Sequence, residues 1–423
     1  MQVAHTHPFS GLLVRLGARL SKQSRTTENQ VLIKSTATLA TGQTEQRRIL
    51  VLCLGGIGDT VLAFAALRDL RRACPDDHIT ALAMWTQSRD LLLDLGIFDE
   101  VLQHNFQTDR LWKSAWRAVK LWFKRFDVSL IAFPANRFEY NLLSWLLGAR
   151  ERWGHRYIRG SNFANLRFLL THHIVQRPGR HVVDENRDLV AAFLGTHEGG
   201  PAEIRLGPID PNYHHDAEEI FGHLSRPLLG VHAGCSVYKG LDTKRWPIER
   251  FAELCRRSYH ELGLQPVIFG APEELKLKHQ IQSACPQVFF AHGETIRHTA
   301  ALIAQCDAFV SNDSALAHIA AAVDVPVVMI CGPTDVGEVR PYGTGQVLGG
   351  RTPCSPCFRV GRVPMCCTNQ TYQACLKSIT VAEVLAAVED CLPRPRPASH
   401  GLGLLPYKSE DTNSFALPVL VTS

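Results

Sequence analysis

A carboxylate follows the first strongly apolar stretch of the chain, at a position suited to proton removal. Residues 49–54 form a continuous apolar run, and Gly55-Gly56-Ile57-Gly58-Asp59 comes directly after it. Glycines between a strand and a helix permit a tight turn or a close approach to phosphate. Asp59 can act there as a general base on a hydroxyl, or it can cap the next helix as a favoured N-cap residue. The loop alone favours neither interpretation.

The same loop lacks the signatures of two common nucleotide sites. Its spacing is Gly-Gly-x-Gly-Asp rather than Gly-x-Gly-x-x-Gly, and the next predicted strand ends in Ala83-Met84-Trp85, without an acid for a ribose hydroxyl. The lysine of a phosphate-binding P-loop is missing, and the first half contains no Tyr-x-x-x-Lys pair. A dehydrogenase or an epimerase is therefore disfavoured.

Two polar segments in the second half of the sequence suit a nucleotide diphosphate. Lys244, in Lys-Arg-Trp-Pro before a predicted helix, can supply a point charge to a diphosphate leaving group. A lone lysine is more commonly a solvated surface residue. Glu273 and Glu274, just past a predicted strand, can accept hydrogen bonds from ribose hydroxyls, or they can simply favour the helix dipole.

A third segment, residues 311–318, runs from a strand end into a helix start. Backbone amides at Ser314 and Ala315, together with the positive end of the helix, would suit a phosphate. His318 comes about one turn after Ser314, so both can face one ligand; a histidine buried in the core is the alternative. Residues 332–335 close the next strand at the same sheet edge.

Strands and helices alternate in two blocks, which predicts an α/β protein with doubly wound sheets. In the first block we expect strands at 49–54, 79–84 and 128–133 and a helix at 60–73. In the second we expect strands at 228–231, 266–269, 288–291, 308–311 and 325–331, and helices at 247–262, 272–284, 295–306, 314–323 and 381–391.

With 423 residues, the chain is too long for one ordinary core. We expect a flexible lead (1–46), a Rossmann-like domain (47–207), a proline-rich linker (208–227), a second Rossmann-like domain (228–392) and a disordered tail (393–423). A cleft between the two domains would be the natural ligand site.

The composition is that of an ordinary globular protein, with 45% hydrophobic and 20% charged residues. The net charge of +5 favours anionic partners such as phosphates or a membrane face and does not single out nucleic acid. No apolar run is long enough to span a bilayer, and the N-terminus makes a poor signal peptide. Residues 9–20 could form a basic amphipathic helix that rests on an anionic membrane or packs on the protein's own surface. We expect a cytoplasmic protein.

Taken together and in order, these segments resemble glycosyltransferase family 9, the ADP-heptose:lipopolysaccharide heptosyltransferases, from about residue 48 to residue 392. The most specific matches are Leu54-Gly-Gly-Ile-Gly-Asp-Thr60, Ser311-Asn-Asp-Ser-Ala-Leu-Ala-His318 with Cys331-Gly-Pro-Thr-Asp335, and Lys244-Arg-Trp-Pro247 followed by Phe251.

The resemblance implies a GT-B fold, in which two Rossmann-like doubly wound domains face a central cleft, and an inverting transfer without a metal. Asp59 would take the proton of the acceptor hydroxyl as it attacks the anomeric carbon, and Lys244 would neutralise the leaving ADP. Glu273 or Glu274 would hold the ribose. The residues implied to line the diphosphate and sugar are Gly58, Asp313, Ser314, Ala315 and His318. The family usually has Thr-Gly where this chain has Ser314-Ala315, which keeps a hydroxyl and a small residue.

The implied donor is ADP-heptose, and the implied acceptor is an anionic lipopolysaccharide core glycolipid at the cytoplasmic face of the inner membrane. A protein O-heptosyltransferase and a transferase of another nucleotide sugar remain open. A non-catalytic nucleotide-sugar-binding protein is the alternative of another class. Asp59 and Lys244 together argue against it, because pure binding needs no carboxylate facing a lysine across a cleft.

Five of the thirteen cysteines lie between Cys354 and Cys375, beginning with a Cys-x-x-Cys motif. This spacing is typical of zinc sites. We slightly favour a structural zinc or iron held by Cys354, Cys357, Cys367 and Cys375, with Cys366 as a substitute for Cys367. A related group that glycosylates autotransporter proteins carries an iron-binding cysteine motif, and disulfides are the alternative in an oxidising compartment. The other eight cysteines are expected to be free, mostly buried thiols.

Overall fold

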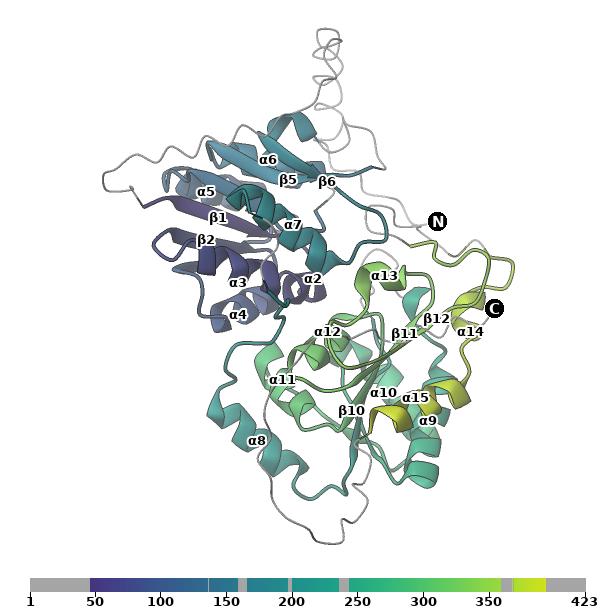
Figure 1. The fold of residues 1–423 in the computed structure, drawn as a ribbon. Helices are drawn as coiled ribbons and strands as arrows, with labels where there is room; N and C mark the ends of the chain where they lie inside the picture. The colour runs from purple at the N-terminus through teal and green to yellow at the C-terminus, as the bar shows by residue number, and fades with distance from the viewer. Residues whose placement is uncertain are drawn as a thin grey trace, which may run out of the picture.

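The computed structural model describes residues 46–135, 137–158, 166–196, 200–235, 243–358, 367 and 369–392. Two six-stranded sheets, each built only of parallel pairs, lie one after the other along this chain (Figure 1). Nearly all of the predicted lead, including the amphipathic segment 9–20, and the whole predicted tail lie outside the described residues.

The N-terminal sheet has the strand order β3-β2-β1-β4-β5-β6. Its strands are β1 (Arg48–Cys53), β2 (His78–Ala83), β3 (Glu100–Gln103), β4 (Val128–Ile131), β5 (Glu151–Arg156) and β6 (His172–Val175). Strand order reverses between β1 and β4, and the carboxyl end of such a switch point is where open α/β sheets bind ligands. The loop with Asp59 leaves β1 at this point.

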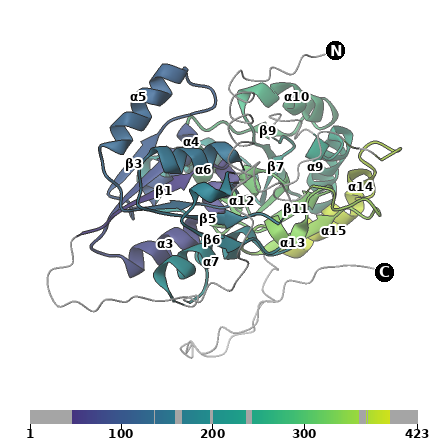
Figure 2. The same ribbon diagram turned by 90° about the horizontal axis from the view of Figure 1, so that it is seen from above.

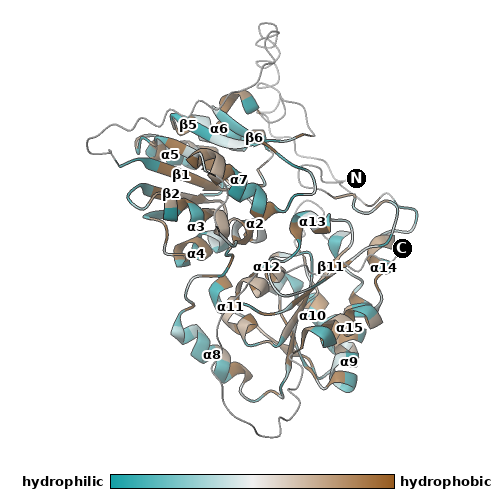
Figure 3. Ribbon diagram, viewed as in Figure 1, coloured by the Kyte–Doolittle hydropathy of each residue, from teal (hydrophilic) through white to brown (hydrophobic). Residues whose placement is uncertain are grey.

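Helices cover both faces of this sheet (Figure 2). Along β1 the side chains alternate between two buried clusters, so that Ile49 and Val51 face one and Leu50 and Leu52 face the other. The first cluster includes residues of α3 (Phe64–Ala73) and α7 (Val182–Leu194), and the second includes residues of α5 (Leu111–Trp122) and α6 (Phe138–Leu146). A strand buried on both faces must be apolar throughout. Figure 3 shows this contrast between β1 and the more hydrophilic strands β5 and β6, the second of which is an edge strand.

The helix predicted at 60–73 is two helices, α2 (Ile57–Leu62) and α3, separated at Ala63. The first begins three residues earlier than expected because Gly56 is its N-cap. Asp59 is therefore not an N-cap residue. Its side chain nevertheless supports the helix start, since its Oδ2 accepts a hydrogen bond from the Gly56 amide at 2.8 Å.

The C-terminal sheet has the strand order β12-β11-β10-β7-β8-β9. Its strands are β7 (Leu228–His232), β8 (Gln265–Ile268), β9 (Phe289–Phe290), β10 (Ala308–Asn312), β11 (Val327–Cys331) and β12 (Gly345–Gly349). Its main helices are α9 (Ile248–Leu262), α10 (Leu275–Ala284), α11 (Ile296–Ala304), α12 (Ala315–Ala322) and α15 (Val381–Cys391). Every strand and helix predicted in this block is present within a few residues.

Three features of the second half differ from expectation. β12 was not predicted, because a half-exposed strand bounded by glycines has no apolar run to reveal it. The helix expected from Pro272 begins as a 3-10 turn, Pro272–Glu274, before α10. In addition, α8 (Pro211–Phe221) lies inside the segment predicted as a linker, and it buries Ala217 and Phe221.

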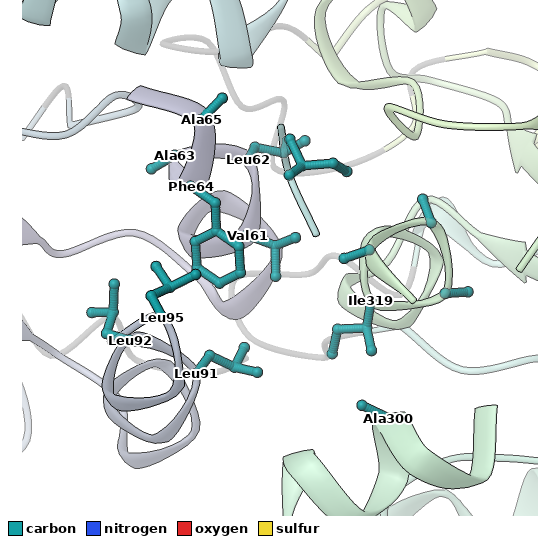
Figure 4. Close-up of a cluster of buried hydrophobic side chains, with 14 of the residues drawn as sticks. Val61, Leu62, Ala63, Phe64, Ala65, Leu91, Leu92, Leu95, Ala300 and Ile319 are labelled. Atoms are coloured by element: carbon teal, nitrogen blue, oxygen red, sulfur yellow. The ribbon is translucent and has the colours of Figure 1, made fainter. Parts of the chain in front are cut away.

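The two halves meet where α2 packs against α12. Figure 4 shows Val61 of α2 and Ile319 of α12 in one buried cluster, with Leu91 of α4 (Thr86–Asp94) and Ala300 of α11 nearby. Since α2 follows β1 and α12 follows β10, this packing brings the carboxyl ends of the two central strands together. Among the residues the structure describes, no helix is long and apolar enough to cross a bilayer.

Candidate functional site

Asp59 lies half-buried just past the end of β1. Burial raises the pKa of its carboxyl to about 6, against the lowering effects of the Gly56 hydrogen bond and of the Lys244 charge; Asp313 raises it further. Lys244 and Asp313 belong to the other half of the molecule. The charges that act on Asp59 therefore come from the other half of the molecule.

Gly58, in the first turn of α2, packs closely against α12. A Cβ atom at this position would lie 2.9 Å from Cδ2 of His318 and 3.4 Å from the Cα of Ala315. A larger residue would therefore require the His318 ring or the start of α12 to shift. The three predicted site residues Gly58, Ala315 and His318 are thus brought together by the tertiary structure.

Lys244 and Asp313 form a buried ion pair. Lys244 Nζ donates to Asp313 Oδ2 at 2.6 Å, and Thr334 Oγ1 donates to the same oxygen at 2.6 Å. Burial favours the neutral form of both groups, yet their mutual attraction outweighs it, so the pKa of Asp313 is lowered and that of Lys244 is raised. Lys244 is therefore charged and is not a solvated surface lysine. Its Nζ also lies 3.9 Å from the ring centre of Phe358.

His318 is buried but its hydrogen bonds are incomplete. Burial lowers the pKa of its imidazole to about 4, although the nearby Asp313 carboxylate raises it. Within the described ranges, its buried Nδ1 has no hydrogen-bond partner. A buried polar atom without a partner costs about 1–3 kcal/mol, which a hydrogen bond to a bound molecule would offset. A neutral imidazole with one unpaired nitrogen suits a ligand.

A second network, centred on His232, lies beside the ion pair. The Nδ1 of His232 is 3.0 Å from Ser314 Oγ, which is 2.8 Å from Ser311 Oγ, and its Nε2 is 3.1 Å from Glu274 Oε2. The amide of Ala271 donates to the same glutamate oxygen at 3.0 Å. Burial alone would raise the pKa of Glu274, but the contact with His232 and the amide bond lower it.

The structure separates the two candidate glutamates. Glu274 is part of the His232 network, whereas Glu273 is exposed. The packing is tight, because a Cβ at Gly234 would overlap the Glu274 carboxylate. Sequence reasoning did not select His232 or Thr334 as site residues. His232 is the last residue of β7 and Thr334 comes just after β11, so both lie at the carboxyl edge of the sheet, which was the available signal.

The four predicted metal ligands line one pocket. The pocket is lined by Cys354, Cys357, Cys367 and Cys375 together with Phe358. Hydrogen bonds lower the pKa of the Cys354 thiol, while burial raises those of Cys357 and Cys375. In the part of the chain that the structure describes, no group of three potential ligands is placed to hold a metal ion. Cys366 lies outside that part, so the metal assignment stays a prediction.

The remaining eight cysteines are free, as predicted. Seven of them are buried: Cys53, Cys74, Cys235, Cys255, Cys285, Cys306 and Cys331. Cys391 is partly exposed.

Comparisons with known proteins agree with this architecture. A lipopolysaccharide heptosyltransferase 1 from Pseudomonas aeruginosa is 25% identical over 338 residues, which cover 74% of this chain and 86% of that protein. The solved E. coli ADP-heptose LPS heptosyltransferase II superposes with a TM-score of 0.62 at 24% identity, covering 81% of this chain and 98% of that one. E. coli heptosyltransferase WaaC, solved with ADP-2-deoxy-2-fluoro heptose, gives a TM-score of 0.59 at 18% identity, covering 81% and 99%. The predicted α/β class and GT-B type are confirmed.

The sequence profile of glycosyltransferase family 9 (heptosyltransferase) matches residues 119–366, more than half of the chain. The family suggested by the sequence motifs is therefore confirmed by an independent match. This chain belongs to glycosyltransferase family 9, the heptosyltransferase family, and is a glycosyltransferase.

Proposed function

We propose that the protein transfers a heptose from ADP-heptose to a lipopolysaccharide core acceptor, with inversion at the anomeric carbon and without a catalytic metal. The observation that carries the proposal is the half-buried carboxylate of Asp59 just past β1, whose pKa is raised by burial and lowered by the charge of Lys244 from the other half. The donor and acceptor are those in the names of the relatives. The reaction would take place at the cytoplasmic face of the inner membrane, where such an acceptor is built.

In this mechanism the acceptor hydroxyl loses its proton to Asp59 while its oxygen attacks the anomeric carbon. The bond from that carbon to the ADP oxygen breaks on the opposite face, so a single displacement inverts the centre. Negative charge then develops on the leaving diphosphate, and Lys244 neutralises it. Asp59 afterwards returns its proton to water.

The donor would be held mainly by the C-terminal half. Glu274 would accept hydrogen bonds from the ribose hydroxyls, and Ser314 and Ala315, at the positive end of α12, would face the diphosphate. His318 would offer its unpaired Nδ1 to the donor. The absence of a side chain at Gly58 would let the donor lie close to the backbone at the start of α2.

Product analysis with purified full-length protein tests the proposal. With ADP-heptose and a lipopolysaccharide acceptor lacking heptose, we expect one heptose to be added per acceptor and one ADP to be released, as measured by mass spectrometry. GDP-, UDP- and other ADP-sugars serve as donor controls, and an acceptor peptide as the acceptor control. Preferential labelling of the peptide, or ADP-heptose binding without turnover, would reject the proposed reaction.

The pH profile should show an acid limb set by Asp59. Only the ionised carboxylate can accept a proton, and its pKa is raised to about 6. We therefore expect kcat/KM to be constant above that pH and to fall about tenfold per pH unit below it. Bound donor adds negative charge near Asp59, which raises the pKa of its carboxyl. The acid limb of the kcat profile should therefore lie at a higher pH than the acid limb of the kcat/KM profile. Initial rates between pH 4.5 and 8.5 measure both, and a flat profile through pH 5 would remove Asp59 as the base.

A further inference from the structure

The helix α5 exposes an unusual amount of apolar surface. Leu121 is its buried side chain, whereas its large apolar residues and the residue after it are each 51–67% exposed. These residues are Leu111, Trp112, Trp116, Val119, Trp122 and Phe123. Exposed clusters of large apolar side chains mark interaction sites.

Helical periodicity places much of this surface on one stripe. Trp112, Trp116, Val119 and Phe123 follow the spacing i, i+4, i+7 and i+11, so they share a face directed away from the buried Leu121. The outward stripe is therefore not the side by which the helix packs on the sheet.

The surface extends beyond this stripe toward α6. The ring of Trp122 lies over Gly148, just after α6, where a Cβ would come within 2.7 Å of it. The end of α6 adds the exposed side chains of Trp145 and Leu146. The apolar surface thus continues from α5 onto its neighbour.

A row of basic residues borders the apolar stripe. Residues 110–125 contain six Lys and Arg side chains and no Asp or Glu, namely Arg110, Lys113, Arg117, Lys120, Lys124 and Arg125. Lys120 Nζ lies 3.5 Å from the ring centre of Trp116, and Lys113 Nζ lies 5.7 Å from that of Trp112. Lys124 is partly neutralised by Glu100 at 2.8 Å. The apolar face is therefore flanked by cationic groups.

We propose that α5 with Phe123 is a membrane-docking surface that seats this protein on an anionic phospholipid bilayer. Tryptophan favours the boundary between headgroups and acyl chains, and flanking lysines and arginines favour anionic lipid. A second copy of this chain would be a poor occupant, because it would bring two basic rows together. The inference uses α5 and its surroundings only, so it stands independently of the proposed transfer reaction.

Vesicle co-sedimentation of the full-length protein tests this surface. We expect binding to phosphatidylglycerol–phosphatidylethanolamine vesicles and much weaker binding to phosphatidylcholine vesicles. Two variants, Trp112→Ser/Trp116→Ser/Phe123→Ser and Lys113→Glu/Lys120→Glu, should each weaken binding to the anionic vesicles by at least about tenfold. The matched control, Leu275→Ser/Lys276→Glu, changes exposed residues of α10 and should bind as the wild type does.

Three further measurements make the outcome decisive. Circular dichroism should show unchanged folding of all variants, because the altered side chains are exposed. Transfer to a water-soluble core oligosaccharide should keep its wild-type rate, which separates this inference from the proposed function. Light scattering reports any dimer that the tryptophan variant dissociates. Wild-type vesicle binding by both α5 variants would place the membrane contact elsewhere, such as in residues 9–20, and a dimer formed through α5 would likewise overturn the proposal.

Discussion

Replacing Asp59 with asparagine is expected to lower kcat for heptose transfer by about 10²–10⁴-fold, the range that general-base catalysis contributes. The amide cannot accept the proton of the acceptor hydroxyl. Its oxygen can still accept the hydrogen bond from the Gly56 amide, so the start of α2 should be kept. Affinity for ADP should stay within about twofold, because the loss concerns the transition state and not ground-state binding.

Single-turnover transfer assays measure the rate, and calorimetry with ADP measures the binding. The matched control is Asp76→Asn, an exposed carboxylate in the loop before β2, which should leave both quantities unchanged. An Asp59→Asn variant that retains more than about a tenth of wild-type kcat would contradict the assignment of the base. A variant that instead lost ADP affinity would show that Asp59 holds the donor.

Variants of the Lys244–Asp313 pair should separate the effect of Lys244 on stability from its effect on catalysis. In Lys244→Met, Asp313 stays buried and charged without its partner, which should lower the free energy of unfolding by about 3–5 kcal/mol. Loss of the charge facing the leaving diphosphate should also lower kcat/KM by about 10²–10³-fold. The double variant Lys244→Met/Asp313→Asn removes both charges, so it should regain most of the stability without regaining the activity.

A double-mutant cycle compares the wild type, both single variants and the double variant. Denaturant unfolding measures their stability, and initial rates measure their activity. Asp313→Asn by itself is the necessary control, because Asp313 also accepts a hydrogen bond from Thr334. Recovery of both stability and activity in the double variant would mean that Lys244 only neutralises Asp313. Unchanged stability in Lys244→Met would mean that the pair is not buried as the structure shows.

Local sequence signals determined the elements of this protein and their order. A parallel strand buried on both faces must be apolar at every position, so β1 was visible as residues 49–54, and glycines with a carboxylate marked the loop that follows. The segment from Ser311 to His318 was recognisable for the same reason, as a strand end running into a helix start. These signals were sufficient to predict the α/β class. Together with the resemblance of the motifs, they were also sufficient to predict the family.

The tertiary structure decided what those residues contact. Lys244 pairs with an aspartate 69 positions away, and His318 meets Gly58 across the boundary between the halves, so neither contact leaves a local pattern. The choice of Glu274 over its neighbour depended on the position of His232, and the exposure of α5 depended on how little of that helix the sheet covers. The periodicity of apolar residues in the sequence indicates which side chains are buried away from water. Only the packed chain determines which groups then face each other, because that depends on pairs far apart in sequence.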